Sequence, residues 1–169
     1  MRKLIGGFAI SLDGFIEGPG GEYDWIIMDR ADVEDSSKNY DCFLFGRISY
    51  EKLGNLGVES FKGIECIVFS NSLSAVRPGY QLVKDDIGSY VLKLKEQNGK
   101  NIAVYGGANF LGSLLNLDLV DELHFSLMPV LIGSGKPMIG NLENRKGLEL
   151  YDVKTFPSGL VKLFYNVKK

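Results

Sequence analysis

The sequence has few of the residue types on which several classes of protein depend. Its 169 residues include one histidine and two cysteines, too few to make a zinc site of the usual spacing. Cys42 and Cys66 each lie within an apolar run. That setting is typical of small buried side chains rather than of a structural disulfide. The sequence therefore predicts neither a metal site nor a disulfide framework.

Charge of one sign and long apolar runs are also scarce. The formal net charge is −2 and no long basic run occurs, so the sequence lacks the electrostatic signature of nucleic-acid binding. No uninterrupted apolar stretch reaches about 18 residues, the length that a membrane-spanning helix needs. The apolar N-terminal run stops before Asp13 and Glu17 without a small-residue cleavage site, so it predicts a core strand rather than a signal peptide. We expect a cytoplasmic protein with no nucleic-acid or membrane partner.

Apolar runs and helical patterns alternate along the chain and indicate one α/β domain over residues 1–169. A glycine-rich loop, residues 12–25, is long for a connector, as functional loops often are. Asp85 and Asp86 are candidate N-caps for a helix that begins at Ile87. The last three strands predict an antiparallel C-terminal edge. The predicted strands are 3–11, 41–46, 64–69, 101–105, 121–131, 148–156 and 160–168. Residues 29–39 are predicted to be helical, the helix after Asp86 is predicted to stop at Asn98-Gly99, and another helix follows Gly106-Gly107 through about residue 116.

Three short motifs share one arrangement, in which a strand ends, small residues follow and a helix can begin. The first is Phe45-Gly46-Arg47-Ile48-Ser49-Tyr50-Glu51. Gly46 would let the backbone approach a ligand closely. Arg47 and the Ser49 hydroxyl could then bind a phosphate beside the first amides of the helix. The same pattern also occurs at an ordinary capped helix start.

The second and third motifs repeat this arrangement farther along the chain. Gly106 and Gly107 precede Ala108-Asn109-Phe110, and adjacent glycines allow successive amides to face a pyrophosphate, although such a pair is also a common turn. Ser70 and Asn71 follow the strand at 64–69 and suit a ribose phosphate.

Common nucleotide-binding fingerprints are absent. No Gly-x-Gly-x-x-Gly follows the first strand, and no Gly-x-x-x-x-Gly-Lys-Ser/Thr occurs anywhere in the chain. The usual dinucleotide-binding fold and the phosphate-loop NTPases are therefore disfavoured. Because open α/β sheets bind ligands beyond the carboxyl ends of their strands, we expect the three strand-end motifs to converge on one cleft.

A set of motifs follows in one order along nearly the whole chain, from about residue 2 to residue 167. They are Ser11-Leu12-Asp13-Gly14, Tyr23-Asp24-Trp25, Phe45-Gly46-Arg47, Gly106-Gly107, and Asp121-Glu122-Leu123 through Pro129-Val130-Leu131-Ile132-Gly133-Ser134-Gly135-Lys136-Pro137. In this order the motifs resemble the dihydrofolate-reductase-like family. They are most similar to its branch that contains the reductase domain of bacterial riboflavin biosynthesis.

The resemblance implies a three-layer α/β/α fold with a central, mostly parallel sheet and an antiparallel C-terminal edge. It also implies a homodimer that binds NADPH and transfers a hydride to a small pterin-like or aminouracil-like heterocycle. A cis peptide between Gly106 and Gly107 is a further expectation. The implied cofactor contacts are Ala9 and Ile16 at the nicotinamide, Gly46, Arg47 and Ser49 at a phosphate, Ser70 and Asn71 at the adenosine end, and Gly106, Gly107, Ala108, Asn109 and Phe110 at the pyrophosphate.

Two departures from the family pattern bear on the substrate. Tyr105 stands where riboflavin-pathway reductases usually carry a glutamate, just before the two glycines. The carboxylate that folate reductases place on their first helix falls in register with Arg30, with Asp29 and Asp32 nearby. We therefore predict an NADPH-dependent reductase of a small heterocycle. The alternatives are the ribosylaminouracil phosphate reductase of riboflavin biosynthesis and a non-catalytic nucleotide-binding module on the same fold.

Five side chains have two interpretations each. By resemblance Asp13 contacts the substrate, yet it could instead order its loop through an Asx-turn. Either Asp13 or water would deliver the proton. Trp25 could anchor its loop or line the substrate pocket. Tyr50 and Tyr105 could pack in the core or contact the substrate. His124 alternates with apolar neighbours on a strand, so we expect a structural or interface role rather than a catalytic one.

Overall fold

A computed structural model describes residues 1–28, 38–54, 61–84 and 86–169 of the chain. Residues 29–37 of the predicted first helix, among them Arg30, lie outside the described residues, as does Asp85. The elements are β1 (Leu4–Gly6), β2 (Ala9–Ser11), β3 (Phe15–Glu17), β4 (Tyr40–Gly46), α2 (Arg47–Lys52), β5 (Glu65–Phe69), β6 (Tyr80–Val83), α3 (Ile87–Glu96), β7 (Asn101–Gly106), α4 (Ala108–Asn116), β8 (Glu122–Met128), β9 (Lys136–Pro137), β10 (Leu148–Thr155) and β11 (Val161–Val167).

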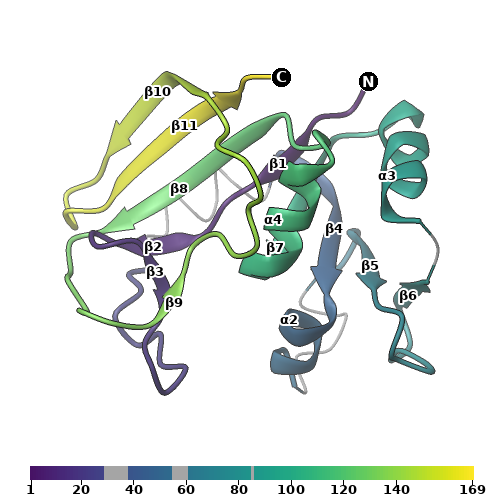
Figure 1. The fold of residues 1–169 in the computed structure, drawn as a ribbon, viewed down its shortest axis with the longest axis horizontal. Coiled ribbons are helices and arrows are strands. Elements are labelled where there is room, and N and C mark those ends of the chain that lie inside the picture. Colours follow the sequence, from purple (N-terminus) through teal and green to yellow (C-terminus); the bar gives the residue numbers. More distant parts are fainter. Residues whose placement is uncertain (29–37, 55–60, 85) are drawn as a thin grey trace.

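One mixed sheet spans the molecule (Figure 1). Its strand order is β10-β11-β8-β1-β7-β4-β5-β6, and β2 also pairs with β8. The pairs from β8 to β6 are parallel, whereas β11 lies antiparallel to both β8 and β10. A separate ribbon joins β3 to β9. The mostly parallel sheet with an antiparallel C-terminal edge is therefore confirmed.

The predicted first strand is present, but it is divided into β1 and β2. Both halves pair with β8 in a single register, with Gly6 opposite Leu123 and Ala9 opposite Ser126. Between them Gly7 passes so close to β8 that a Cβ there would lie 1.7 Å from the backbone oxygen of His124. Only glycine fits this approach, which brings the first strand against the His124 backbone.

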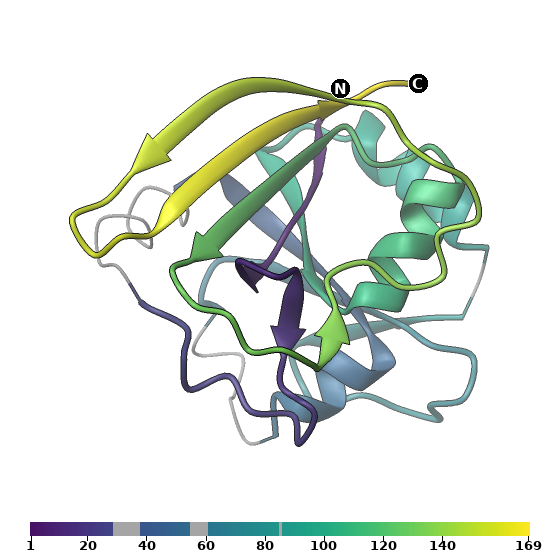
Figure 2. The same cartoon turned by 60° about the vertical axis from the view of Figure 1, so that its left-hand side comes forward.

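Helices pack on both faces of the sheet, α2 on one face and α3 and α4 on the other. Figure 2 shows α3 and α4 together on one side of the strands. Successive side chains of a strand point to opposite faces, so Leu44 of β4 joins the core beneath α3 and α4, and Phe45 joins a second core beneath α2. Val91 of α3 and Leu111 of α4 are fully buried in the first core. The predicted three layers are confirmed.

Some predicted boundaries were wrong. Strand β8 ends at Met128 rather than at residue 131, because Pro129 follows and has no amide hydrogen for the ladder. Asp86 caps α3 as predicted, accepting hydrogen bonds from the amides of Gly88 and Ser89. The short strands β3, β6 and β9 have no counterpart among the predictions.

The two cysteines are buried and unpaired, as predicted. Burial raises the pKa of Cys42 to about 12 and that of Cys66 to about 11, so both thiols stay protonated near neutral pH. Among the described residues, no helix is both long and apolar enough to cross a membrane.

Candidate functional site

The carboxyl ends of β4 and β7 open into a cavity of about 240 Å³, here called the strand-end cavity. Its wall combines two of the predicted motifs, because both strands are parallel and end at the same edge of the sheet. The lining residues are Gly46, Arg47, Ile48, Ser49, Phe69, Gly107, Ala108, Asn109, Phe110, Ser113 and Lys136. Seven of them were predicted as cofactor contacts.

Backbone amides are available on one side of this cavity. Helix α4 begins at Ala108, and no side chain accepts a hydrogen bond from its first amides. The Gly106–Gly107 peptide is cis, as the resemblance implied. A Cβ on Gly106 would lie 2.6 Å from Ser49 Oγ, and one on Gly107 would lie 2.9 Å from it. The bare glycines therefore leave room for the Ser49 hydroxyl beside the helix start, a combination suited to an anion.

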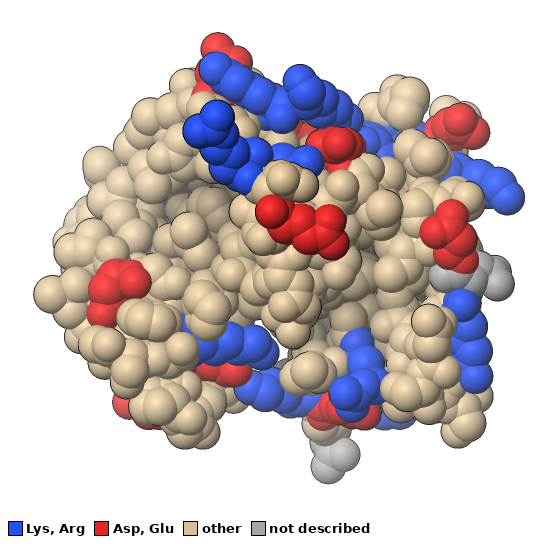
Figure 3. Space-filling view, viewed as in Figure 1, with Lys and Arg blue, Asp and Glu red and all other residues tan. Residues whose placement is uncertain are grey.

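Positive charge lines the strand-end cavity, although the whole chain is slightly negative. Arg47 and Lys136 are the cations among its lining residues. Arg47 Nη1 lies 2.7 Å from Glu51 Oε2, one helical turn away. Figure 3 shows Lys and Arg side chains along the lower edge of the molecule, the edge that carries β3 and α2 in Figure 1.

Glu17 of β3 holds Lys136 from the other side. Its carboxylate lies 3.3 Å from Lys136 Nζ and 2.5 Å from Lys52 Nζ of α2. Burial alone would raise the pKa of Glu17, but the two lysines outweigh it and lower that pKa below its ordinary value. The ionised carboxylate thus links the β3–β9 ribbon to α2 at the margin of the cavity.

The third motif lies apart from this cavity. Ser70 Oγ accepts hydrogen bonds from the amides of Ser72 and Leu73, at 3.2 Å and 3.1 Å, so it orders its own turn. Ser70 and Asn71 do not line the strand-end cavity, although Phe69 just before them does. Ile16, predicted at the nicotinamide, packs against the first core, the one beneath α3 and α4.

A second cavity of about 560 Å³, here called the large cavity, lies on the other side of the end of β7. Tyr105 lines the large cavity and Gly107, two residues farther along the chain, lines the strand-end cavity. The end of β7 thus contributes to both cavities, although they share no lining residue. The lining residues of the large cavity are Ile5, Gly6, Gly7, Phe8, Ala9, Ile26, Ile27, Met28, Tyr40, Phe43, Ala103, Val104, Tyr105, His124, Ser126, Met128 and Lys162.

Tyr105, one of the predicted substrate contacts, forms an aromatic wall of the large cavity. Its ring centroid lies 4.8 Å from that of Phe45 and 5.5 Å from that of Phe43. Ala9, predicted at the nicotinamide, also lines this cavity. A mainly apolar wall with a few polar groups is typical of a small-molecule site.

The other two aromatic substrate contacts predicted from the sequence line neither cavity. Tyr50 is buried in the second core, and its hydroxyl accepts a 2.8 Å hydrogen bond from the Arg77 amide. The Arg77 guanidinium lies 4.4 Å from the centre of the same ring. Trp25 is half-buried, and its indole nitrogen has no hydrogen-bond partner among the described residues. Their assignment to the substrate stays a prediction.

The Asp13 carboxylate holds a loop that lies far along the chain. It accepts hydrogen bonds from the amide of Gly133, at 2.7 Å, and from that of Ile132, at 3.2 Å. A hydrogen bond with Ser11, together with these amides, lowers the pKa of Asp13, so the group is ionised near neutral pH. Asp13 lines neither cavity. This placement indicates a structural role, in which Asp13 joins its loop to residues 132–133 rather than forming the predicted Asx-turn. The catalytic assignment stays a prediction.

Asp13→Asn separates these two interpretations. An amide oxygen is a weaker acceptor than a carboxylate, so we expect the amide of Gly133 to exchange with solvent severalfold faster, as measured by hydrogen exchange. NADPH affinity should change little. Unaltered exchange combined with a loss of reductase turnover would instead favour the catalytic role.

A third cavity, of about 370 Å³, adjoins the large one and is here called the polar cavity. Ile5, Tyr40, His124 and Lys162 line both. Its remaining lining residues are mostly polar: Lys3, Asn39, Asn101, Glu122, Tyr151, Asp152, Lys154 and Phe164. In the part of the chain that the structure describes, no group of three or more His, Cys, Asp or Glu side chains gathers at a candidate metal position.

Several lining residues were not predicted. Lys136 belongs to a motif noted in the sequence, but its place in the cavity was not predicted. The sequence around it does not show that β9 returns to the ends of β4 and β7. Ser126 and His124 stand at alternate positions of β8, and Glu122 precedes them at the same spacing. This run of polar residues on one face of an otherwise apolar strand was the signal that could have identified them.

Comparisons with known proteins agree with this geometry. The model of one family, the RibD C-terminal domain, matches residues 2–162. An uncharacterized Bacillus subtilis protein, YyaP, is 35% identical, over 98% of this chain and 95% of its own. The crystal structure of a putative riboflavin biosynthesis protein from Shewanella sp. PV-4 has a TM-score of 0.81 at 24% identity, covering 99% of both chains. Enterococcus faecalis dihydrofolate reductase, solved with NADP(H), has a TM-score of 0.70 at 13% identity, covering 99% of this chain and 97% of its own.

Proposed function

This chain belongs to the RibD C-terminal domain family, and from that premise we propose that it is an NADPH-dependent reductase of a small pterin-like or aminouracil-like heterocycle. The observation that carries the proposal is that the end of β7 contributes to two unlike cavities, through Tyr105 and Gly107. One is lined by cations and open amides, and the other is larger and mainly apolar. Hydride transfer requires such adjacent sites, because both reactants must be held in contact.

The residues present fit a dinucleotide phosphate in the strand-end cavity. The uncapped amides at the start of α4, the Ser49 hydroxyl and the two cations Arg47 and Lys136 would hold its phosphate groups. When bound, NADPH supplies a hydride from its nicotinamide ring. Ala9 and Ile16 are proposed to flank that ring, and Ser70 and Asn71 are proposed for the adenosine end.

The large cavity is proposed for the substrate. Its apolar wall would exclude water and orient a flat ring, and Tyr105 with Phe43 offers aromatic faces for such a ring to pack against. The protein's contribution is thus to place two ligands and to keep their meeting point dry. We also propose that the chain acts as a homodimer, as the resemblance implies, and that it is cytoplasmic, as the N-terminal sequence pattern indicates.

The proposal is tested by titrating the protein with NADPH and, separately, with NADH. Trp25 is the only tryptophan, so the quenching of its fluorescence by energy transfer to bound NADPH gives a signal from one known position. We expect micromolar binding that prefers NADPH, followed by NADPH oxidation at 340 nm when pterins or aminouracils are added. No binding of either cofactor would refute the proposal.

The same assay separates the alternatives. Turnover confined to the ribosylaminouracil phosphate would favour the riboflavin-pathway reductase. The family name supports this assignment, whereas Tyr105, in place of the usual glutamate, argues against it. NADPH binding without oxidation by any of these substrates would favour the non-catalytic nucleotide-binding module.

A further inference from the structure

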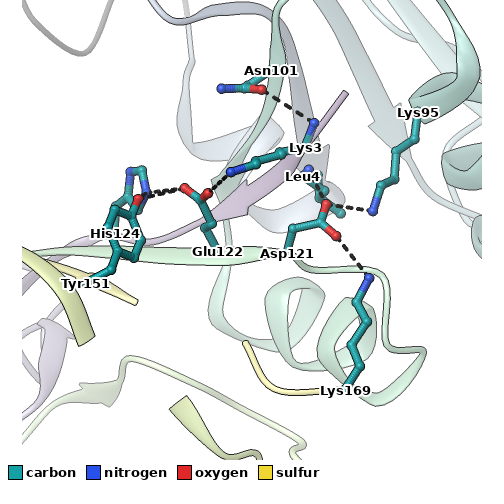
Figure 4. A network of polar contacts seen from close by, with 9 residues as sticks. All are labelled: Lys3, Leu4, Lys95, Asn101, Asp121, Glu122, His124, Tyr151 and Lys169. Atoms are coloured by element: carbon teal, nitrogen blue, oxygen red, sulfur yellow. Dashed lines mark hydrogen bonds and ion pairs between the residues drawn. The ribbon is translucent and has the colours of Figure 1, made fainter. Parts of the chain in front are cut away.

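A polar network lies at the start of β8, in the wall of the polar cavity, and its His124 also lines the large cavity (Figure 4). Its centre is the Glu122 side chain, which is only 7% exposed. One carboxylate oxygen lies 2.5 Å from Lys3 Nζ. The other accepts a 2.8 Å hydrogen bond from the Tyr151 hydroxyl and lies 2.9 Å from His124 Nε2.

This arrangement fixes the form of the His124 ring. Burial alone would raise the pKa of Glu122, but hydrogen bonds from Lys3, Tyr151 and His124 outweigh it and lower that pKa. The ionised carboxylate can only accept hydrogen bonds, so the facing Nε2 must carry the hydrogen. In the neutral ring Nδ1 is then an acceptor, and the contacts with Glu122 and Tyr151 are both made through Nε2. The Phe164 ring, 4.7 Å away, limits rotation of the imidazole.

The position of His124 connects the network to the proposed substrate. Its side chain is 16% exposed and lines both the large cavity and the polar cavity. Two residues farther along β8, Ser126 also lines the large cavity. An imidazole that is held by a carboxylate at one nitrogen and lines a ligand cavity has the arrangement of a general acid–base group.

We infer that His124, held by Glu122, donates the proton that completes substrate reduction in the large cavity. The inference rests on the proposed reductase function. Hydride addition forms a C–H bond at the substrate carbon, breaks the π bond of its C=N or C=O group and leaves the electron pair on nitrogen or oxygen. The Nδ1–H bond of the imidazolium then breaks as an N–H or O–H bond forms on the substrate. The neutral ring regains its proton from solvent through the polar cavity.

The charges around the ring set the direction of its titration. Burial lowers the pKa of His124, Glu122 opposes that shift, and the positive charges of Lys162 and Lys3 add to it. The groups that face it come from four elements and the chain before β1: Lys3, Tyr40 of β4, Glu122 of β8, Tyr151, Asp152 and Lys154 of β10, and Lys162 of β11. The donor form is therefore lost as pH rises, and turnover should fall with it.

The chain contains only one histidine, so imidazole NMR tests the inference without any substrate. We expect the neutral ring to carry its hydrogen on Nε2. Glu122→Gln should lower the pKa of His124, because the facing negative charge is lost. Tyr151→Phe should raise the pKa of His124, because the Glu122 oxygen that faces the imidazole then no longer accepts a hydrogen bond from Tyr151. A neutral ring protonated on Nδ1 would overturn the inference.

Asp121→Asn is the matched control. Asp121 directly precedes Glu122, but it bonds to Lys95, Lys169 and the Leu4 amide instead (Figure 4). This variant also loses a carboxylate, yet its histidine titration should match that of the wild type. A shift as large as that in Glu122→Gln would show that general charge, and not the pairing, sets the titration.

Turnover completes the test. We expect His124→Gln to bind NADPH normally and to reduce substrate about a hundredfold more slowly, without the fall at high pH. In Glu122→Gln that fall should move to lower pH, following the NMR pKa. Wild-type rates and pH profile in His124→Gln would overturn the inference alone. Failure of the wild type to bind NADPH or to reduce any substrate would overturn the proposed function, and the inference with it.

Discussion

Gly112→Ala should destabilise the protein by about 3 kcal/mol or more, the range expected for overpacking against rigid backbone. Gly112 lies in α4, and a Cβ there would come within 1.7 Å of the backbone oxygen of Gly140. Gly140 is itself held against the start of α4, because its amide donates a hydrogen bond to the backbone oxygen of Ala108. Gly140 and the helix start must therefore separate to admit one methyl group. Urea unfolding followed by circular dichroism measures the loss.

A second helical glycine provides the control. In α3 the Cβ added at Gly88 would meet only the Asp86 carboxylate, at 3.6 Å, an ordinary contact. Gly88→Ala should therefore stabilise the protein by about 0.5–1 kcal/mol through helix propensity. Equal unfolding midpoints for the two variants would mean that α4 does not pack against residue 140 as described. Loss of NADPH binding by Gly112→Ala at temperatures where it remains folded would show that this contact also shapes the strand-end cavity.

The sequence was most informative where structure depends on local pattern. Residues 41–46, 64–69 and 101–105 are apolar runs because both faces of their strands are covered, and each was predicted within about one residue. The side chain of Asp86 identified the start of α3 correctly. Strands β3, β6 and β9 have two to four residues, and their pairing depends on distant partners, which a local pattern does not reveal.

The candidate site divides in the same way. Gly46, Arg47, Ser49 and the residues after Gly107 follow strand ends, so the rule that ligands bind at the carboxyl edge of a sheet was enough to predict that they meet. Lys136 reaches the same cavity from β9, and only the tertiary fold brings it there.

His124 illustrates what the sequence leaves open. Alternation along β8 indicated correctly that its side chain faces away from its apolar neighbours Leu123 and Phe125, which are buried in the core. The pattern could not show that Glu122 is itself buried, or that Tyr151 of β10 and Lys3 meet it. A histidine on a solvated strand face is usually structural, whereas one held by a buried carboxylate at a cavity wall has the geometry for proton transfer.

Arg47→Met should weaken NADPH binding about tenfold or more, because a charge-assisted hydrogen bond to a phosphate contributes about 1.5–3 kcal/mol and this side chain is partly exposed. Methionine keeps an unbranched stem of similar shape and removes the guanidinium with its charge and donors. The same tryptophan titration with NADPH and NADH identifies which phosphate Arg47 contacts. A loss for NADPH alone indicates the additional phosphate of that cofactor, and equal losses indicate the pyrophosphate.

Glu51→Gln is the matched variant, and it should act in the opposite direction. Glu51 lies 2.7 Å from the Arg47 guanidinium, so a bound phosphate must share or displace that pairing. Removing the carboxylate charge also removes repulsion of the phosphate, and NADPH should bind a few times more tightly, most clearly at low ionic strength. When Arg47→Met is already present, Glu51→Gln should increase NADPH affinity less, because no guanidinium remains to be released from the Glu51 carboxylate. Wild-type NADPH affinity in Arg47→Met, or weaker binding in Glu51→Gln, would mean that the cofactor's phosphates lie elsewhere.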